Sequence, residues 1–491
     1  MPPILDSLPT FPSAARRRAF SFFRVALGAA FLAGRPAVAA AEASGALSPE
    51  VRAEVDRAAT RTLAGMGVPS VSVAVVQDGR IVYVQAYGDA RVAQGSEPAR
   101  PAQPSMRYGI GSISKQFTAT AILMLAEDGK LSLDDPVSRY RPDLTRAAEV
   151  TVRQLLSHTA GYQDYWPQDY VPPFMLSEVT AGQILERWAG KPLDFEPGTK
   201  WQYSNTGFVL AGAIAEKAGG RPLVDLLRER VFVPLEMKSV IDINRERLTG
   251  ADPVAYTRYA LGPLRPAPKE GKGWLFAAGE LAMTAEDLAR WDVAMIQKRL
   301  LKPASYAAMQ ADVKLSSGAA TGYGLGIGVG SVLGRRALSH SGGVSGFVTR
   351  NVVFPDDRGA VVALTNSDAT DAAAVVARKV AAILFCVPDG GAAAELRRIR
   401  TMLEGLQRGQ VDRAQLSENA SSYFDAEALR DFATSLGGLG AIEDLEPSGC
   451  EDRGGMAFRG YRAVFPTKSV DVTVRTLPDG KIEQLQVASV D

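Results

Sequence analysis

Residues 70–87, SVSVAVVQDGRIVYVQAY, decide the fold of this chain. Both ends of the segment are rich in valine, isoleucine and tyrosine, which favour β-strands. Gln77-Asp78-Gly79-Arg80 lies between them and contains Asp-Gly, a pair typical of a tight hairpin turn. The segment therefore predicts two antiparallel strands, Ser70–Val76 and Ile81–Tyr87, at the start of a sheet.

Strand character returns only late in the chain. Short apolar runs separated by turn residues lie at Tyr323–Val329, Arg335–His340, Phe347–Phe354 and Val361–Thr365. Glycines alternate with apolar residues in the first of these runs, which we interpret as a strand with one face free of side chains. The region between, about 140–268, consists of helical segments broken by prolines and aromatic loops. One antiparallel sheet flanked by helices, with an inserted helical region, is an α+β arrangement.

Two domains are expected after the N-terminal segment. The first spans residues 45–387 and begins with a helix at Ser48-Pro49-Glu50, which has the cap, proline and acid of a helix start and a stop at Gly65. Pro388-Asp389-Gly390-Gly391 is interpreted as a linker. Residues 392–491 then contain two helical segments followed by alternating strands, which is the size and pattern of a small α+β domain.

The composition excludes several classes of protein. Lys and Arg number 55 and Asp and Glu 54 among 491 residues, so the formal net charge is +1 and no global field favours nucleic acid. Two cysteines are too few for a disulfide scaffold or a thiolate metal cluster. Two histidines, His158 and His340, argue against a multi-histidine metal site. We therefore expect no metal and no other cofactor, and no nucleic-acid partner.

Residues 1–39 have the pattern of an export signal. Arg16-Arg17-Arg18 precede the apolar run Val25–Ala33, and Ala37-Val38-Ala39 places small residues at the two positions that a signal peptidase reads. Arg17-Arg18-Ala19-Phe20 also resembles a twin-arginine signal. The apolar run is too short to span a bilayer, which needs about 20 residues. A periplasmic or secreted protein with no stable membrane span is expected.

Ser112-Ile113-Ser114-Lys115 carries the first chemical signal. It lies where the loop Gly109-Ile110-Gly111 ends and a helix is predicted over Ile113–Glu127. A serine in the first turn of a helix lies at the positive end of the helix dipole. A lysine three residues later is on the same face, so its amine can reach the serine hydroxyl. Alone, a Ser-x-x-Lys pattern is weak, because any helix can contain one by chance.

Two further segments give the pattern its weight. Tyr203-Ser204-Asn205 lies in a loop before a predicted helix, and His340-Ser341-Gly342-Gly343 ends a late strand. Together with Leu155–Gly161, these motifs resemble the penicillin-recognising serine hydrolases: class C β-lactamases, serine DD-carboxypeptidases and their esterase and D-aminopeptidase relatives. The resemblance covers about residues 45–385. It implies a β-lactamase-like fold and a serine acyl-enzyme.

The resemblance also implies a role for each residue of the motifs. Tyr203 would be the general base for Ser112, which requires a phenol pKa about 3 units below its usual 10 and therefore a charged Lys115 close by. Asn205 would hold the Lys115 amine and the substrate amide. His340 would lie across the cleft, and the backbone amides of Ser112 and Gly343 would form the oxyanion hole, with Gly342 and Gly343 permitting close backbone approach.

Some residues leave alternatives open. His340 stands where β-lactamases have lysine; its imidazolium could bind a substrate carboxylate, or the ring could form hydrogen bonds only within the site. Glu280 stands where relatives have a second glycine, and we expect it to be solvated rather than facing the site. His158 is interpreted as structural. Cys386 and Cys450 could bridge the two domains, but buried unpaired thiols are expected.

The function predicted is that of an exported serine hydrolase acting on an amide or ester. Its partner would be a small-molecule or peptide substrate, with a cell-wall D-peptide, a β-lactam and an ester as the alternatives. The sequence contains no Gly-x-Ser-x-Gly elbow, which argues strongly against an α/β-hydrolase. A penicillin-binding module that acylates and turns over slowly stays open, because a deacylation rate cannot be read from these motifs.

Overall fold

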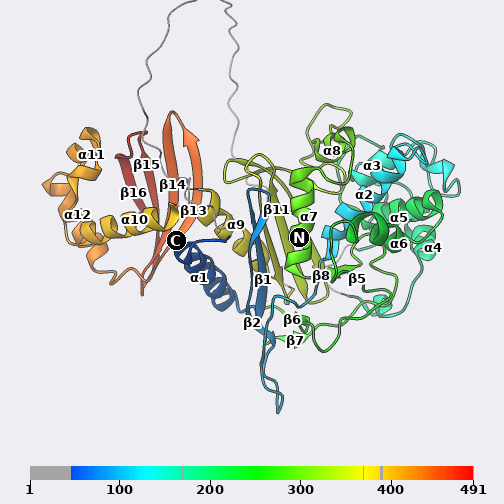
Figure 1. Ribbon diagram of the computed structural model, residues 1–491, viewed down its shortest axis with the longest axis horizontal. Coiled ribbons are helices and arrows are strands. Elements are labelled where there is room, and N and C mark those ends of the chain that lie inside the picture. The colour runs from blue at the N-terminus through cyan, green and yellow to red at the C-terminus, as the bar shows by residue number, and fades with distance from the viewer. Residues whose placement is uncertain (1–45, 167–170, 369, 387–390, 490–491) are drawn as a thin grey trace, which may run out of the picture. The chain divides into compact units, whose positions relative to one another are not determined.

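A seven-stranded antiparallel sheet is the central element of the structure, a computed structural model that describes residues 46–166, 171–368, 370–386 and 391–489 (Figure 1). The strand order is β3-β2-β1-β12-β11-β10-β9. Val71 pairs with Thr365, so early and late strands join in one sheet and the predicted α+β arrangement is confirmed. The strands are β1 (Ser70–Gln77), β2 (Arg80–Arg91), β3 (Arg100–Pro101), β9 (Gly328–Val332), β10 (Arg335–Val344), β11 (Phe347–Phe354) and β12 (Gly359–Thr365).

Two of the predicted segments fall on residues that are not described. The export signal expected over residues 1–39 lies outside the described residues, as does most of the linker expected at Pro388–Gly391. Of the helices within the described ranges, none combines the length and the apolar character needed to cross a membrane.

The hairpin between β1 and β2 forms as its sequence predicts. Asp78 and Gly79 both have positive φ, 51° and 72°, which is the backbone of a type I′ turn and matches the twist of the two strands. β1 then lies between β2 and β12 with every residue from Ser70 to Val76 buried. This explains why valine or alanine occurs on both faces, with the small Ser70 and Ser72 on the face of Ala74 and Val76.

The two faces of the sheet carry different layers. Val71, Val73 and Val75 pack in a cluster with α1 (Pro49–Met66) and α9 (Ala372–Phe385). Ala74 and Val76 point into the larger cluster that contains α2 (Ser114–Glu127) and α7 (Ala285–Gln297). Figure 1 shows α1 and α9 on one side of β1 and α7 on the other. The Ser112 motif therefore belongs to the α2 and α7 side.

The inserted region is mainly helical, as predicted, with α5 as its one long helix among those described, and it also contains the two-residue strands β5, β6 and β7, which were not expected. Thr151 and Thr180 cap two of its helices with reciprocal side-chain bonds to the glutamine three residues on. A small sheet of order β4-β8-β5 lies at its border and leads into the Ser112 turn. The elements of this part are α3 (Val152–Leu156), α4 (Ala181–Ile184), α5 (Asn205–Gly219), α6 (Leu223–Leu227), α8 (Pro303–Gln310), β4 (Tyr108–Gly109), β5 (Ile241–Asp242), β6 (Tyr256–Thr257), β7 (Arg265–Pro266) and β8 (Leu281–Met283).

Two predictions about glycines are wrong. α1 continues through Gly65 and ends at Gly67, whose φ of 61° forms the left-handed cap. Gly324 and Gly326 precede β9 and are not in a strand. A Cβ on Gly324 would lie 2.1 Å from Met309 O, and one on Gly326 would lie 2.7 Å from Lys115 O. These glycines thus permit backbone contact with α8 and α2.

The last hundred residues form a four-stranded antiparallel sheet and its helices, as predicted. The sheet has its own core of apolar side chains, separate from the two clusters of the larger sheet. Arg61 and Lys379, on α1 and α9, form ion pairs of 2.9 Å with Asp444 and Glu446 of its first strand. The elements are α10 (Ala392–Gln407), α11 (Glu418–Tyr423), α12 (Ala426–Gly437), β13 (Asp444–Arg453), β14 (Met456–Val464), β15 (Ser469–Thr476) and β16 (Ile482–Ser489).

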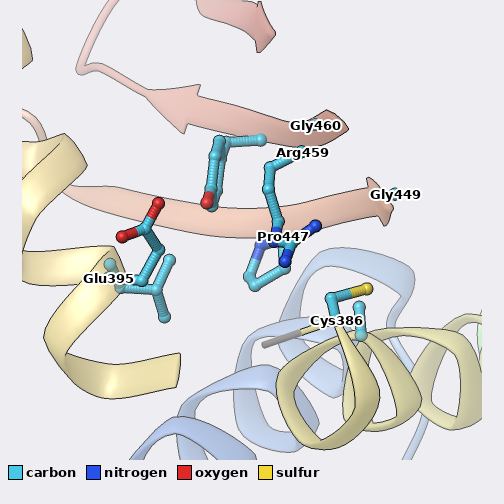
Figure 2. A pocket seen from close by; sticks show the side chains of 9 residues that line it. Cys386, Glu395, Pro447, Gly449, Arg459 and Gly460 are labelled. Carbon is cyan, nitrogen blue, oxygen red and sulfur yellow. The ribbon is translucent and has the colours of Figure 1, made fainter. Parts of the chain in front are cut away.

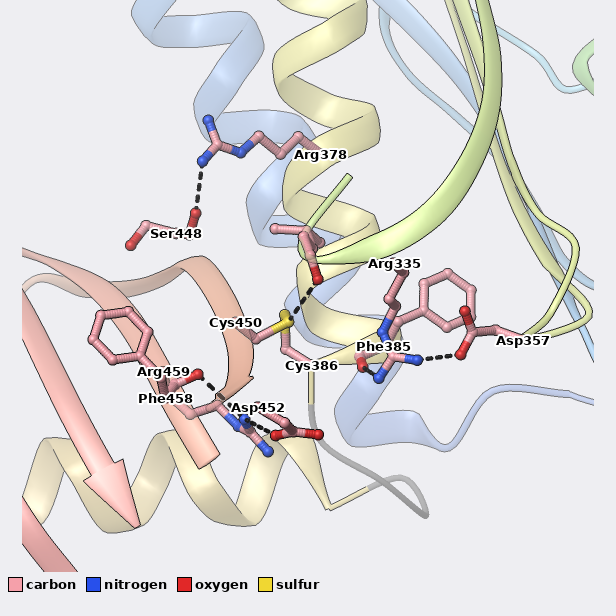
Figure 3. Close-up of a disulfide and its surroundings, with 11 residues drawn as sticks. Arg335, Asp357, Arg378, Phe385, Cys386, Ser448, Cys450, Asp452, Phe458 and Arg459 are labelled. Atoms are coloured by element: carbon pink, nitrogen blue, oxygen red, sulfur yellow. Dashed lines mark hydrogen bonds and ion pairs between the residues drawn. A yellow bond between two sulfur atoms is a disulfide. The ribbon is translucent and has the colours of Figure 1, made fainter. Parts of the chain in front are cut away.

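A disulfide joins the two parts. Cys386, directly after α9, is bonded to Cys450 of β13, so the expectation of unpaired thiols is wrong (Figure 3). Because the two residues are 64 positions apart, no local sequence pattern predicts the pairing. A small cavity of about 10 Å³ lies beside Cys386, between α10 and the strands that carry Pro447 and Arg459 (Figure 2).

Breaking this disulfide should destabilise the C-terminal sheet. For a closed loop of 64 residues, the lost cross-link corresponds to about 4 kcal/mol of chain entropy in the unfolded state. The double variant Cys386→Ala/Cys450→Ala should therefore unfold at a lower urea concentration, measured by hydrogen exchange of the β13–β16 amides. Reductant should lower the midpoint of the wild type and leave that of the variant unchanged. A wild-type midpoint insensitive to reductant would contradict this role.

Candidate active site

Ser112 is held at the entrance to α2 by a close contact between two backbones. It lies in a single 3-10 turn, Gly111–Ile113, that runs directly into the helix. A Cβ on Gly342 would lie 1.8 Å from Ile110 O, and one on Gly111, whose φ is 52°, would lie 2.7 Å from Gly343 N. Only glycine fits at these two positions, so the end of β10 can approach the serine turn. Gly343 has open space at its Cβ, and its side-chain-free character is not needed for this contact.

Lys115 lies one turn along α2 with its side chain completely buried. Its Nζ is 3.0 Å from Ser112 Oγ, 2.7 Å from Asn205 Oδ1 and 2.8 Å from Ala278 O. The last two atoms can only accept hydrogen bonds, whereas a hydroxyl can donate or accept. The amine is therefore fixed by two carbonyl-type oxygens and directed at the serine.

The protonation state of Lys115 follows from its burial. Removal from water lowers the pKa of the amine to about 7, an effect that the negative charge of Asp164 opposes. A neutral amine has two N–H donors and one lone pair. The charged amine donates to all three oxygens, Ser112 Oγ included. If the neutral amine keeps its N–H bonds to Asn205 Oδ1 and Ala278 O, its lone pair is directed at the Ser112 hydroxyl. In its neutral form Lys115 can thus accept the serine proton.

The pKa of the Tyr203 phenol is shifted in the direction opposite to the one expected. Burial and the charge of Asp164 raise the pKa of its phenol, and the hydrogen bond with Ser112 opposes this only in part. The Lys115 amine lies 4.9 Å from the centre of the Tyr203 ring, so the two side chains are neighbours as predicted. Burial disfavours the charged form of both groups, so the Tyr203 pKa is shifted in the direction opposite to the one that a general base needs, and the role of Tyr203 stays a prediction.

His158 packs against the segment that contains Tyr203. The ring is buried and its Nδ1 accepts a hydrogen bond of 3.1 Å from the backbone N–H of Ser204. Its ring centre is 4.3 Å from that of Tyr203. Burial lowers the pKa of this imidazole well below its usual value. These contacts agree with the structural role expected from the sequence.

Asp164 is a site residue that the sequence reasoning did not identify. It lies in the loop that follows Leu155–Gly161. Its Oδ1 accepts from the backbone N–H groups of Asn205, at 3.0 Å, and Trp166, at 3.2 Å. Its Oδ2 accepts from Asn205 Nδ2 at 3.1 Å. An acid three residues beyond a motif glycine in an aromatic loop was the only signal available.

His340 uses both ring nitrogens within the protein. Nδ1 lies 2.6 Å from the carbonyl oxygen of Ser341, which can only accept, so Nδ1 carries the proton. Nε2 therefore accepts from the Tyr323 hydroxyl at 2.7 Å. Burial lowers the imidazole pKa to about 3, which leaves the ring neutral at ordinary pH. Of the two alternatives for His340, this geometry favours hydrogen bonding within the site.

Glu280 is buried, so the expectation of a solvated side chain is wrong. Its Oε2 accepts from Asn244 Nδ2 at 3.0 Å, and burial together with the nearby Asp242 raises its carboxyl pKa well above the usual value. Its partners are thus Asn244 and Asp242 rather than water. The structure thus brings together Ser112, Lys115, Tyr203, Asn205, His340, Gly342 and Gly343, while their roles in a reaction stay predictions.

Comparisons with known proteins agree with this arrangement. The family model described as Beta-lactamase matches residues 55–385. A penicillin-binding protein of Bacillus subtilis (strain 168) is 30% identical over 60% of this chain and 68% of its own length. A D-aminopeptidase of Cereibacter sphaeroides is 30% identical over 64% of this chain, which spans 60% of that relative's length.

A solved structure gives the same result for the fold. A D-stereospecific amidohydrolase from Streptomyces sp. is 29% identical, with a TM-score of 0.57 over 66% of this chain and 96% of its own. The match covers a share of the chain similar to that of the family model, which includes every motif residue of the site. With the fold, the site and these matches in agreement, this chain belongs to the beta-lactamase family and is a hydrolase with that family's fold.

Proposed function

We propose that this protein is an exported serine hydrolase that cleaves an amide or ester bond through an acyl-enzyme on Ser112. The observation that carries the proposal is the contact of 3.0 Å between Lys115 Nζ and Ser112 Oγ, made by an amine whose pKa is lowered to about 7 by burial. A base with a pKa near the working pH combines the correct protonation state with useful basicity.

The reaction follows from the hydrogen bonds. Ser112 Oγ attacks the substrate carbonyl carbon while its proton passes to the neutral Lys115 amine. The carbonyl oxygen becomes an oxyanion beside the backbone amides of Ser112 and Gly343. When the bond to the leaving group breaks, that group takes the phenol proton of Tyr203, and the proton that Lys115 received from Ser112 passes to the phenolate, so both groups return to their neutral forms. Water then hydrolyses the Ser112 ester and restores the enzyme. In this scheme Lys115 replaces Tyr203 as the base, because burial makes the phenol a donor.

Amides of D-amino acids are the substrate class that the relatives support best. The relatives include a D-aminopeptidase and a D-stereospecific amidohydrolase. Cell-wall D-peptides and β-lactams are the second class, supported by the penicillin-binding relative. Both classes present an amide carbonyl to a serine, so the proposed chemistry is shared and only recognition differs. A site that acylates and releases slowly would act as a penicillin-binding module.

Export is supported by two independent features of the chain. Residues 1–39 have a basic segment, an apolar run and a small-residue cleavage pattern. The Cys386–Cys450 disulfide belongs to oxidising compartments such as the periplasm or the extracellular space. Expression with the native N-terminus, followed by fractionation and N-terminal sequencing, should locate the protein outside the cytoplasm with a start near residue 40.

Covalent labelling can identify the nucleophile. A fluorophosphonate probe should add to Ser112, and mass spectrometry should find the adduct on the peptide that contains it. Ser112→Ala should abolish labelling. Ser114→Ala is the matched control, since Ser114 begins α2 directly after the Ser112 turn, accepts a hydrogen bond from Leu281 N at 3.2 Å and is given no part in the proposed reaction. An adduct at another residue, or full labelling of Ser112→Ala, would contradict the proposal.

A second prediction concerns pH. Since Lys115 acts as a base only when neutral, acylation should be slow below pH 7, rise through the amine pKa of about 7 and level off above it. His340, with a pKa of about 3, stays neutral over this range. A neutral p-nitrophenyl ester and a carboxylate-bearing peptide should therefore give parallel profiles of kcat/KM. If kcat/KM for the peptide falls with increasing pH while kcat/KM for the ester rises, a His340 imidazolium binds the carboxylate.

A third prediction separates the substrate classes. D-Alanine amide and D-phenylalanine amide should be hydrolysed with a higher kcat/KM than their L-enantiomers, which serve as the matched controls. A chromogenic cephalosporin and a D-Ala-D-Ala peptide are assayed beside them. A burst of product equal to the enzyme concentration, followed by slow turnover, would assign the slow penicillin-binding alternative. Equal rates for both enantiomers would contradict the D-amino-acid proposal.

A further inference from the structure

Asp164 makes a two-point contact with Asn205, the residue that holds the Lys115 amine. One carboxylate oxygen accepts from the backbone N–H of Asn205 at 3.0 Å, and the other accepts from its side-chain Nδ2 at 3.1 Å. Trp166 N, at 3.2 Å, completes a set of three N–H donors around the two oxygens. The carboxylate therefore fixes both the first residue of α5 and the side chain that it carries.

The orientation of the Asn205 amide depends on this contact. An amide side chain has one accepting end and one donating end, and these are exchanged by a rotation of 180°. Burial raises the Asp164 pKa, whereas the N–H donors of Trp166 and Asn205 and the Lys115 charge favour its ionised form. An ionised carboxylate only accepts, so the donating end of Asn205 faces Asp164. The accepting end then faces Lys115, where Oδ1 lies 2.7 Å from Nζ. Without Asp164 either orientation is allowed, and one of them points an N–H at the lysine amine.

The orientation of Lys115 follows in turn. Its two fixed acceptors, Asn205 Oδ1 and Ala278 O, take the two N–H bonds of the neutral amine and leave the lone pair for Ser112. If Asn205 presented an N–H, it would compete with the Ser112 hydroxyl for that lone pair. We infer that Asp164 is a positioning residue that acts through Asn205 to aim the Lys115 amine at Ser112. This inference rests on the proposed function.

Asp164 also contributes its charge. Its carboxylate raises the pKa of Lys115 against the effect of burial. The other ionisable groups facing the amine are Tyr203, His158 and His340. Burial raises the pKa of the phenol and lowers the pKa of both imidazoles, so each of these side chains is neutral. Among the described residues that act on the amine, Asp164 is thus the source of negative charge. Geometry and charge can be separated by choice of variant.

The test measures the rate of Ser112 labelling by a fluorophosphonate as a function of pH, on the full mature chain. Asp164→Asn presents an amide that can donate to Asn205, so the Asn205 amide is free to turn. We expect the plateau rate to fall about 100-fold, as for other losses of reactive alignment. We also expect the midpoint near pH 7 to move about 1 unit lower, because the negative charge is lost.

Two further variants distinguish the effect of the Asp164 charge from that of its geometry, and an effect specific to this position from a general loss of folding. Asp164→Glu keeps the charge but moves the carboxylate, so the plateau should fall while the midpoint stays. Asp292→Asn is the matched control, because Asp292 is also a buried acid that accepts from an asparagine amide, Asn351 Nδ2 at 2.9 Å, and does not contact Lys115. Its profile should match that of the wild type. Thermal unfolding of each variant checks that the chain is folded.

A double variant tests whether Asp164 acts through Asn205. Once Asn205→Ala has removed the amide, adding Asp164→Asn should lower the plateau less than about threefold further, because the two changes disrupt one unit. Full additivity would overturn the inference, as would a wild-type profile for Asp164→Asn. If Asp164→Asn does not fold, Asp164→Glu decides the geometric part. Failure of the wild type to label at Ser112 would instead overturn the proposed function, and the inference with it.

Discussion

The burial of one amine organises this site. Lys115 Nζ is removed from water and surrounded by three oxygens, from Ser112, Asn205 and Ala278. A buried charge without a direct counter-ion is costly, so the amine is driven toward its neutral form. Several neighbouring elements together position the amine. α2 carries the lysine, α5 and the Ala278 loop supply acceptors, and β10 meets the serine turn. The basicity of the site is thus a property of packing rather than of any one residue.

Much of the fold follows from short-range signals. The turn at Asp78-Gly79, the start of α1 at Ser48 and the end of α2 at Glu127 were predictable because their signals lie within a few residues of the feature. The errors have the opposite origin. Gly324 and Gly326 look like strand residues by alternation, yet their backbones contact Met309 and Lys115, which are distant in sequence. Alternation in a local window cannot reveal which backbone lies opposite a glycine.

The site shows the same division between local and distant information. The motif residues were predictable because their spacing resembles a known family, and the structure brings them together. Their protonation states were not, since burial by the whole fold lowers the Lys115 pKa and raises that of Tyr203. Asp164 was missed because its partner Asn205 is 41 residues away. The disulfide was not expected for the same reason, since its cysteines are 64 positions apart.

The pairing of β1 with β12 has a consequence for how the chain folds as it is made. The two neighbours Val71 and Thr365 are separated by almost 300 residues. At about 5–20 residues per second, the hairpin of β1 and β2 waits roughly 15–60 s for its central partner to be synthesised. During that time one long edge of β1, a strand rich in valine, is unpaired and open to association with other chains. This sheet order therefore leaves a strand edge unpaired during synthesis for longer than a sheet of consecutive hairpins would.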